Sequence, residues 1–291
     1  MELPLVVGVD GSDSSLAALD WAVDEAARRG VPLRLVYASL WERYEDVAPS
    51  TSMDRPSEQV MAENIVGTAA ERAQRRNPEV KVSAEVVGEE AVDALLREGR
   101  NASALVTGSR GRGELKGLLL GSVGLAVAAR AHCPVIVVRG DKAGVEGTHE
   151  RIVLGAGEPA SGGEAARFAF LEAEARGAVL DVVRAWRCPA HETADEPRLA
   201  EDPAHLHEER ASAQLDALLQ DAVTDHPAVR ARRNTVEGPA RRVLLNRSAA
   251  ADLVVIGARR RTGYFGLQLG RVGHTLLHHA QCPVAIVPQR V

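Results

Sequence analysis

The sequence predicts an α/β protein built from two tandem, doubly wound, parallel five-stranded sheets, each with the strand order 3-2-1-4-5. Three observations support this prediction. At 291 residues the chain has the length of two domains of roughly 145 residues each. Val-rich apolar runs, typical of strands buried on both faces of a parallel sheet, alternate with segments of helical periodicity. The second half of the chain repeats the pattern of the first half.

Three pairs of segments carry the repeat: AHCPVIVV at 131–138 and AQCPVAIV at 280–287, SALVTGSR at 103–110 and ADLVVIGAR at 251–259, and VVGVDGS at 6–12 and VLGAGEP at 153–159. The offset is 149 residues for the first two pairs and 147 for the third, which indicates that one ancestral unit was copied whole. We therefore expect one domain over 1–140 and a second, degenerate domain over 150–291. The polar, Gly-containing segment 141–150 is the expected linker.

Within the first copy, strand and helix patterns alternate along the chain. The expected strands lie near 4–9, 33–38, 80–86, 103–107 and 134–138. The expected helices lie near 13–29, 57–76, 89–98 and 121–131. The 3.6-residue period is clearest in the first helix, at Leu16, Leu19, Ala22, Val23 and Ala26. Such alternation predicts a parallel sheet with helices on both of its faces.

The second copy repeats this order of elements. Its expected strands lie near 151–156, 178–184, 229–235, 252–256 and 283–287. In both copies a long break, 39–55 or 185–203, follows the second strand. These breaks would leave the sheet at its carboxyl edge, where such folds place loops that cover ligands.

The composition excludes several classes of protein. A net charge of −5 gives no basic surface of the kind that binds nucleic acid. No apolar run approaches the roughly 20 residues that span a bilayer, and the amino terminus has no signal-peptide pattern. Cys133 and Cys282 occupy matching repeat positions, and we expect them to be buried free thiols, with a disulfide between them as the alternative. These observations together predict a cytoplasmic protein.

A candidate phosphate cradle follows the fourth strand of the first copy. Gly108-Ser-Arg-Gly111 is followed after nine residues by Gly121-Ser122, which opens a helix. Gly108 and Gly111 permit backbone torsions and close approaches that a Cβ would prevent, and successive N–H groups can form an anion nest. Gly121 and Ser122 would bring an anion to the helix N-terminus, although Ser122 could instead cap that helix. The spacing matches neither a Walker A loop nor a dinucleotide fingerprint.

Asp10 ends the first strand, in the segment GVDGS. In a sheet of order 3-2-1-4-5 the first and fourth strands are neighbours, so Asp10 would face the Gly108 loop across the switch-point crevice. Its carboxylate could accept a ribose hydroxyl or hold a phosphate-bound divalent cation. The alternative is that it caps the first helix, a role that Ser12 or Asp13 could also fill.

Three motifs together resemble the universal stress protein family, in its tandem-domain form. They are GVDGS at the first strand, G-x2-G-x9-G-S after the fourth, and HCPV before the fifth. The resemblance covers essentially the whole chain and implies a flavodoxin-like or Rossmann-like fold that binds ATP, sometimes with a divalent metal such as Mg, with little or no turnover. It places adenine near Ala38, ribose and phosphate near Asp10, and the phosphate chain over Gly108, Arg110, Gly111, Gly121, Ser122 and Val123. It also implies that the fifth strands meet, as an intramolecular pseudo-dimer, and it allows a homodimer.

The second copy departs from the motif at three positions. Gly157 stands in place of Asp10, Arg260 in place of Gly111, and Arg271 in place of Ser122. We expect an intact fold with an empty or altered site. Two alternatives stay open: Arg259, Arg260, Arg261 and Arg271 form a new anion pocket, or they are solvated or paired with acidic groups.

Two weaker signals lie in the second copy. Ser161-Gly162-Gly163 resembles the start of an ATP-pyrophosphate loop, but Glu164 and Ala165 follow where that motif needs other residues. His274, His278 and Cys282 have metal-ligand spacing, but the first copy has Gly124 and Ala128 at the two histidine positions. We assign no metal-ligating and no catalytic residues.

The sequence therefore predicts a stress-response regulatory protein that binds one adenine nucleotide in its first domain. The nucleotide would act by ordering loops and changing the surface shown to a regulatory partner. One alternative is a slow Mg-dependent ATPase that uses Asp10. Another is a structural pseudo-dimer with a vestigial nucleotide site.

Overall fold

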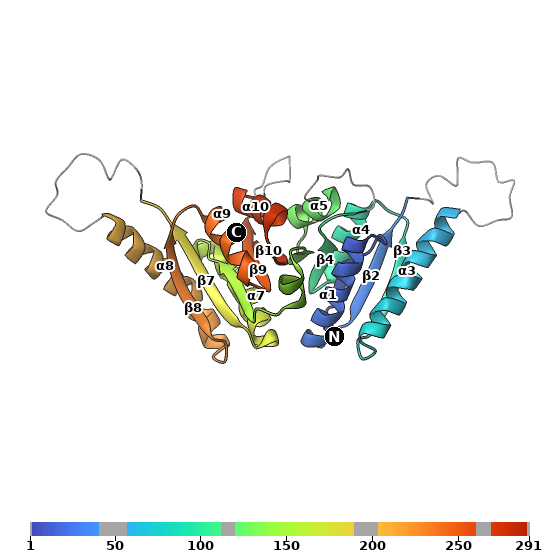
Figure 1. The fold of residues 1–291 in the computed structure, drawn as a ribbon, viewed down its shortest axis with the longest axis horizontal. Helices are drawn as coiled ribbons and strands as arrows, with labels where there is room; N and C mark the ends of the chain where they lie inside the picture. Colours follow the sequence, from blue (N-terminus) through green and yellow to red (C-terminus); the bar gives the residue numbers. More distant parts are fainter. Residues whose placement is uncertain (1, 41–56, 112–119, 189–202, 260–268, 290–291) are drawn as a thin grey trace. The chain divides into compact units, whose positions relative to one another are not determined.

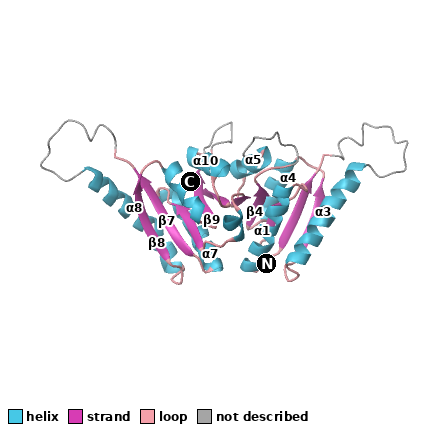
Figure 2. Cartoon of the chain, in the orientation of Figure 1, coloured by secondary structure: helices cyan, strands magenta, loops and turns pink. Residues whose placement is uncertain are grey.

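The computed structural model describes residues 2–40, 57–111, 120–188, 203–259 and 269–289. The chain divides into two compact units, residues 1–139 and 140–291. Both units have the alternating order of strands and helices that the sequence predicts (Figures 1 and 2). None of the described helices is long and apolar enough to cross a membrane.

The first unit contains a parallel sheet in which β1 lies between β2 and β4, with β3 beyond β2 and β5 beyond β4. Its strands are β1(Leu5–Gly8), β2(Leu33–Ala38), β3(Val82–Val87), β4(Ala104–Gly108) and β5(Val135–Val138). Its helices are α1(Asp13–Arg29), α3(Ser57–Arg76), α4(Ala91–Glu98) and α5(Ser122–Arg130), with the short 3-10 helix η1(Gly99–Asn101). Helices α1 and α3 pack together, as do α4 and α5, so that the sheet is doubly wound.

The second unit repeats this topology, with β6 between β7 and β9, β8 beyond β7 and β10 beyond β9. Its strands are β6(Arg151–Gly155), β7(Val179–Trp186), β8(Ala231–Glu237), β9(Leu253–Arg259) and β10(Val284–Gln289). Its helices are α6(Lys142–Glu146), α7(Pro159–Arg176), α8(Pro203–Asp225), α9(Ala240–Arg247) and α10(Arg271–His279), with η3(Ser248–Ala250). Within this unit α7 packs with α8, and α9 with α10.

The expected linker 141–150 packs against the second unit. Asp141 caps α6 by accepting a hydrogen bond from the Gly144 N–H at 2.8 Å, and its own N–H donates to the Gln281 carbonyl at 3.1 Å. A Cβ at Gly140 would lie 2.2 Å from that carbonyl oxygen. The compositional signal of a linker therefore marks a closely packed segment here.

The cores consist mainly of Val, Leu, Ile and Ala, as the scarcity of aromatics requires, with a few buried aromatic side chains such as Phe170. The middle strands β1, β4 and β6 are buried along most of their length, and β9 is buried at residues 253–256. Each unit also buries one carboxylate in its first long helix, which the sequence pattern did not indicate. Glu25 is paired with Arg29 at 2.6 Å, and Glu172 with Arg176 at 3.2 Å.

The cysteines at the matching repeat positions are buried free thiols, as expected. Burial raises the pKa of the Cys133 thiol to about 11. The expected loops at 39–55 and 185–203 fall largely outside the described residues.

Candidate functional site

A cavity of about 480 Å³ lies at the carboxyl edge of the first unit's sheet. All eight residues that the sequence analysis assigns to nucleotide binding line it: Asp10, Ala38, Gly108, Arg110, Gly111, Gly121, Ser122 and Val123. They come from the ends of β1, β2 and β4 and from the start of α5. The parallel sheet brings them together because the carboxyl ends of its strands share one edge.

Gly108 is required by a close approach of two backbones. A Cβ at this position would lie 2.6 Å from both the carbonyl oxygen and the Oγ of Ser14 on α1. The Ser14 hydroxyl in turn accepts a hydrogen bond from the Arg110 N–H at 3.1 Å and so holds the loop against α1. Neither Gly108 nor Gly111 has a positive φ, so the expected need for unusual torsions is wrong and close contact explains both glycines.

The Asp10 carboxylate faces Gly111 across the crevice, as the strand order predicts. A Cβ at Gly111 would lie 2.8 Å from Asp10 Oδ2. The other oxygen, Oδ1, accepts hydrogen bonds from the Ser12 N–H at 2.9 Å and the Ser12 hydroxyl at 2.6 Å. Ser12 caps α1 by accepting from the Ser15 N–H, so Asp10 is not the helix cap. Asp10 is the single acidic side chain among the described residues that line this cavity.

Helix α5 presents its N-terminus to the cavity without a side-chain cap. Its N-cap is Gly121, in extended conformation with φ −72° and ψ 150°, and no side chain bonds to the first turn. Ser122 therefore does not cap the helix. The Gly121 N–H donates to the Ser109 carbonyl at 2.8 Å, which holds the helix start against the Gly108 loop. The first-turn N–H groups and the helix dipole together favour an anion at this end.

Sequence reasoning missed several residues that line the cavity. Val36, Ala91, Leu95 and Leu120 form an apolar wall. Thr107 is 5% exposed, and its hydroxyl has no hydrogen-bond partner. A buried polar atom without a partner is uncommon in native proteins and calls for an explanation such as a ligand. The sequence feature that could have pointed to Thr107 is a hydroxyl residue at the end of an otherwise apolar strand, directly before Gly108.

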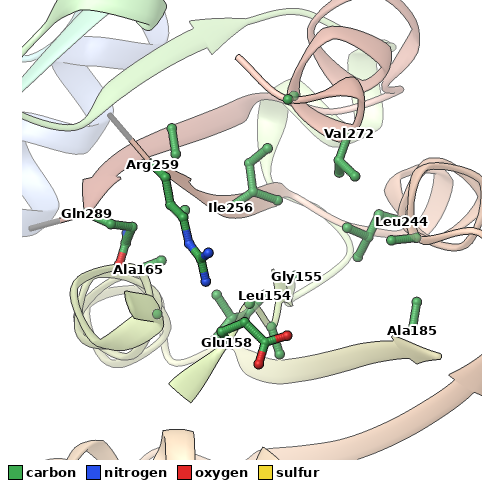
Figure 3. A pocket seen from close by; sticks show the side chains of 18 of the residues that line it. Leu154, Gly155, Glu158, Ala165, Ala185, Leu244, Ile256, Arg259, Val272 and Gln289 are labelled. Carbon is green, nitrogen blue, oxygen red and sulfur yellow. The ribbon is translucent and has the colours of Figure 1, made fainter. Parts of the chain in front are cut away.

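The second unit has a cavity in the equivalent place, with a volume of about 970 Å³ (Figure 3). Gly257 and Gly270 line it, as their equivalents Gly108 and Gly121 line the first cavity. Ala185, at the position equivalent to Ala38, lines it as well. The predicted departures Gly157 and Arg271 also line it. The fold is thus intact and the site altered, as the sequence analysis expects.

New polar contacts occupy the entrance region of this second cavity. The Arg184 guanidinium donates to the Gly157 carbonyl, to Glu158 at 2.8 Å and to Gln214 at 2.6 Å. Arg259 extends from β9 into the space above Glu158 (Figure 3). Arg260 and Arg261, which the anion-pocket hypothesis also names, lie outside the described residues.

The two weaker sequence signals, at residues 161–163 and at His274, His278 and Cys282, do not correspond to binding sites in the described part of the structure. Residues 161–163 lie inside the helix α7, where no phosphate-binding loop exists. The rings of His274 and His278 stack with centroids 6.5 Å apart, while Cys282 is fully buried. No group of three or more metal-ligating side chains occurs among the residues that the structure describes.

Fold and cavity together define a tandem pair of doubly wound α/β units in which each unit carries a ligand-sized cavity at its sheet edge. The chain belongs to the universal stress protein family, whose pattern matches residues 3–139 and again residues 148–288.

Curated relatives resemble the chain over nearly its whole length. It is 34% identical over 295 residues to the universal stress protein Rv2005c of Mycobacterium tuberculosis, covering 98% of this chain and 97% of that protein. It is 31% identical over 304 residues to the universal stress protein Rv2623 of the same species, covering 98% and 96%. A crystal structure of a universal stress protein from Archaeoglobus fulgidus has the same fold, with a TM-score of 0.69 at 16% identity and 98% coverage of both chains.

Proposed function

We propose that the first unit binds one adenine nucleotide, ATP, and that the chain acts as a cytoplasmic stress-response regulator. One observation carries the proposal. The eight residues that the family motif assigns to the nucleotide come from three strands and a helix, and they line one cavity of about 480 Å³. That volume falls within the range typical of small-molecule and cofactor sites.

The cavity divides into parts that suit the parts of a nucleotide. Val36 and Leu95 offer an apolar surface beside Ala38 for the base. Asp10 Oδ2 is the acceptor for a ribose hydroxyl or a partner for a phosphate-bound Mg²⁺. The uncapped start of α5 and the Gly108 loop offer N–H groups to the phosphates, and Arg110 adds positive charge.

We propose binding rather than turnover because the cavity offers little for hydrolysis. Among its described lining residues Asp10 is the single carboxylate, and one of its oxygens already accepts two hydrogen bonds from Ser12. The same carboxylate is the proposed partner of the ribose hydroxyl or of Mg²⁺, so the described lining has no second carboxylate to act as a general base for the attacking water. The nucleotide would instead shift the loops at the sheet edge toward one arrangement by binding it preferentially.

Calorimetric titration of nucleotide-free protein with Mg-ATP tests the proposal. We expect one site per chain, lost in Asp10→Ala and in Ser122→Arg, which places a cation side chain where phosphate would bind. Ser83→Arg is the matched control because Ser83 is an exposed residue of β3 outside the cavity. Loss of binding in this control as well would show a general effect on the fold.

The other outcomes distinguish the rival functions. Two sites per chain would mean that the second cavity also accepts the nucleotide. The absence of binding in the unaltered chain would favour a structural protein with a vestigial site. Steady phosphate release well above that of Asp10→Ala would favour a slow ATPase.

A further inference from the structure

The second cavity has lost the hydrogen-bonding groups that suit a ribose. At the equivalent positions of the two copies, Gly157 replaces Asp10, Gly162 replaces Ser15, and Ile256 replaces Thr107. A site without these acceptors and donors leaves ribose hydroxyls unpaired when they are desolvated, which disfavours a nucleoside.

The same cavity has gained positive charge at its mouth. Arg271 begins α10, whose N-cap Gly270 provides no side-chain hydrogen bond, and Arg259 extends into the cavity from β9 (Figure 3). Both arginines are exposed, so a ligand can reach them from solvent. Glu158, the one carboxylate among the described lining residues, pairs with Arg184, and the three arginines of the lining outnumber it. The planar guanidinium groups and the helix N-terminus therefore favour an anionic group at this place.

A second, independent observation points to a ligand inside the cavity. Gln289, the last residue of β10, is 5% exposed and lines the cavity wall beside Gly257. Its Nε2 donates to the Val287 carbonyl at 2.9 Å, while its Oε1 has no partner. A buried acceptor without a donor destabilises the fold, and a ligand N–H or O–H would remove that destabilisation.

The rest of the wall is apolar. Leu154, Val183, Leu244 and Ile256 line the interior, and the volume of about 970 Å³ is about twice that of the first cavity. This space accommodates an apolar body between the arginines at the mouth and Gln289.

We propose that the second unit binds an organic anion that is not a nucleotide. The ligand class has an anionic carboxylate or phosphate head for Arg259 and Arg271, an apolar body, and a hydrogen-bond donor for Gln289 Oε1. This inference does not depend on nucleotide binding by the first unit, because it uses only residues of the second.

Four probes test the chemistry by calorimetry on the full chain. Indole-3-acetate has the carboxylate, the apolar body and an N–H donor; indole-3-acetamide has the same shape without the charge. Indoxyl phosphate distinguishes a phosphate head from a carboxylate head. AMP is titrated to the Asp10→Ala, Ser122→Arg double variant, so that the first unit's cavity does not contribute to its binding. We expect at least one indole anion to bind with one site per chain, and indole-3-acetamide to bind at least about tenfold more weakly, as loss of a charge-assisted pair predicts.

Variants assign the binding to this cavity. Arg271→Ser and Arg259→Ala should each weaken the indole anion at least about tenfold. Gln289→Ala should weaken it less, because its hydrogen bond is neutral. Arg233→Ala is the matched control, since Arg233 is an exposed arginine of β8 outside the cavity. Equal affinity for the acetate and the acetamide, no binding of either indole anion at millimolar concentration, or binding of AMP in their place would overturn the proposal. A circular-dichroism melt of each variant separates loss of binding from loss of fold.

Discussion

The cavities of the two units share a framework and differ in their polar lining. Both retain glycines at the end of the fourth strand and at the start of the next helix, and both retain Ala at the end of the second strand. Asp10, Ser15, Thr107 and Ser122 in the first cavity are replaced by Gly157, Gly162, Ile256 and Arg271 in the second. Residues that shape the backbone and pack the core have thus been kept, while residues that would contact a ligand have changed. The difference indicates that ligand chemistry can diverge without loss of the fold.

A cluster of charged and polar residues occupies equivalent positions in the two units, and the positions of its positive and negative charges are exchanged. In the first unit, Arg34 on β2 donates to Glu98 at 2.7 Å and also to Glu85. In the second unit the equivalent positions are Asp181, Arg247 and Asn234, and Arg247 and Asn234 both donate to Asp181. Burial acts to lower the pKa of the Arg34 guanidinium, but the hydrogen bonds and charges of Glu98 and Glu85 outweigh burial and raise that pKa. The fold requires complementary partners here, not a particular sign at each position.

The largest expected effect comes from converting the second cavity into the first. The combined substitutions Gly157→Asp, Ile256→Thr, Arg260→Gly and Arg271→Ser should raise the Mg-ATP stoichiometry from one to two per chain. In the reverse direction, Asp10→Gly with Ser122→Arg should weaken Mg-ATP at least about a hundredfold, since each hydrogen bond to a charged group contributes about 1.5–3 kcal/mol. Calorimetry measures both changes. If the stoichiometry stays at one, the larger volume of the second cavity, and not its polar lining, decides the selectivity.

A stability comparison at equivalent glycines comes next. Gly108→Ala should lower the free energy of unfolding by about 2–3 kcal/mol, because its Cβ would meet the Ser14 backbone carbonyl at 2.6 Å. Gly257→Ala should cost less than about 1 kcal/mol, because its Cβ would meet the Gln289 side-chain amide at 2.9 Å, which can rotate. Urea denaturation followed by circular dichroism compares the two variants. Equal losses would contradict the assignment of Gly108 to a backbone contact.

The exchanged ion pairs give a smaller effect. Arg247→Ala should destabilise by about 2 kcal/mol, because it leaves the Asp181 carboxylate, 7% exposed, with one neutral partner. Arg34→Ala should cost about 1 kcal/mol, because Glu98 keeps Arg97 as a partner at 3.1 Å and Glu85, 47% exposed, remains solvated. The triple variant Arg34→Asp, Glu85→Asn, Glu98→Arg recreates the second unit's partners in the first. Its thermal midpoint should lie above that of Arg34→Asp alone, and a midpoint at or below it would refute the equivalence.

The smallest effect concerns Cys133 and alkaline pH. The folded thiol has its pKa raised from 9.0 to about 11, so the unfolded chain loses the proton first as pH rises. The associated stability is complete below pH 9 and declines toward pH 11, with a loss of about 1 kcal/mol between about pH 8 and pH 9.5. The difference between unaltered protein and Cys133→Ala in urea denaturation at the two pH values isolates this contribution. A difference that does not change with pH would show that the folded thiol ionises normally.

Much of the fold could be predicted because hydrophobic period and repetition are local properties of the chain. The first helix and the ten strands were predicted from such patterns, whereas the set of eight candidate site residues came from the family resemblance; the structure brings those eight residues to one cavity. The packing of the segment 141–150 could not be predicted, because its polar, Gly-containing composition gives no sign of its contact with the Gln281 carbonyl. Contacts between residues far apart in sequence have no local signature.

By itself, the sequence determined the family, the two-unit repeat, the parallel α/β order and the difference between the two motifs. Tertiary structure alone decided that Gly108 is needed for its approach to Ser14 rather than for its torsions. It also decided that the Thr107 hydroxyl and Gln289 Oε1 are buried without partners and line their cavities. The physical reason is that periodicity records which face of an element is apolar, whereas burial and hydrogen bonding of one polar atom depend on every element packed around it.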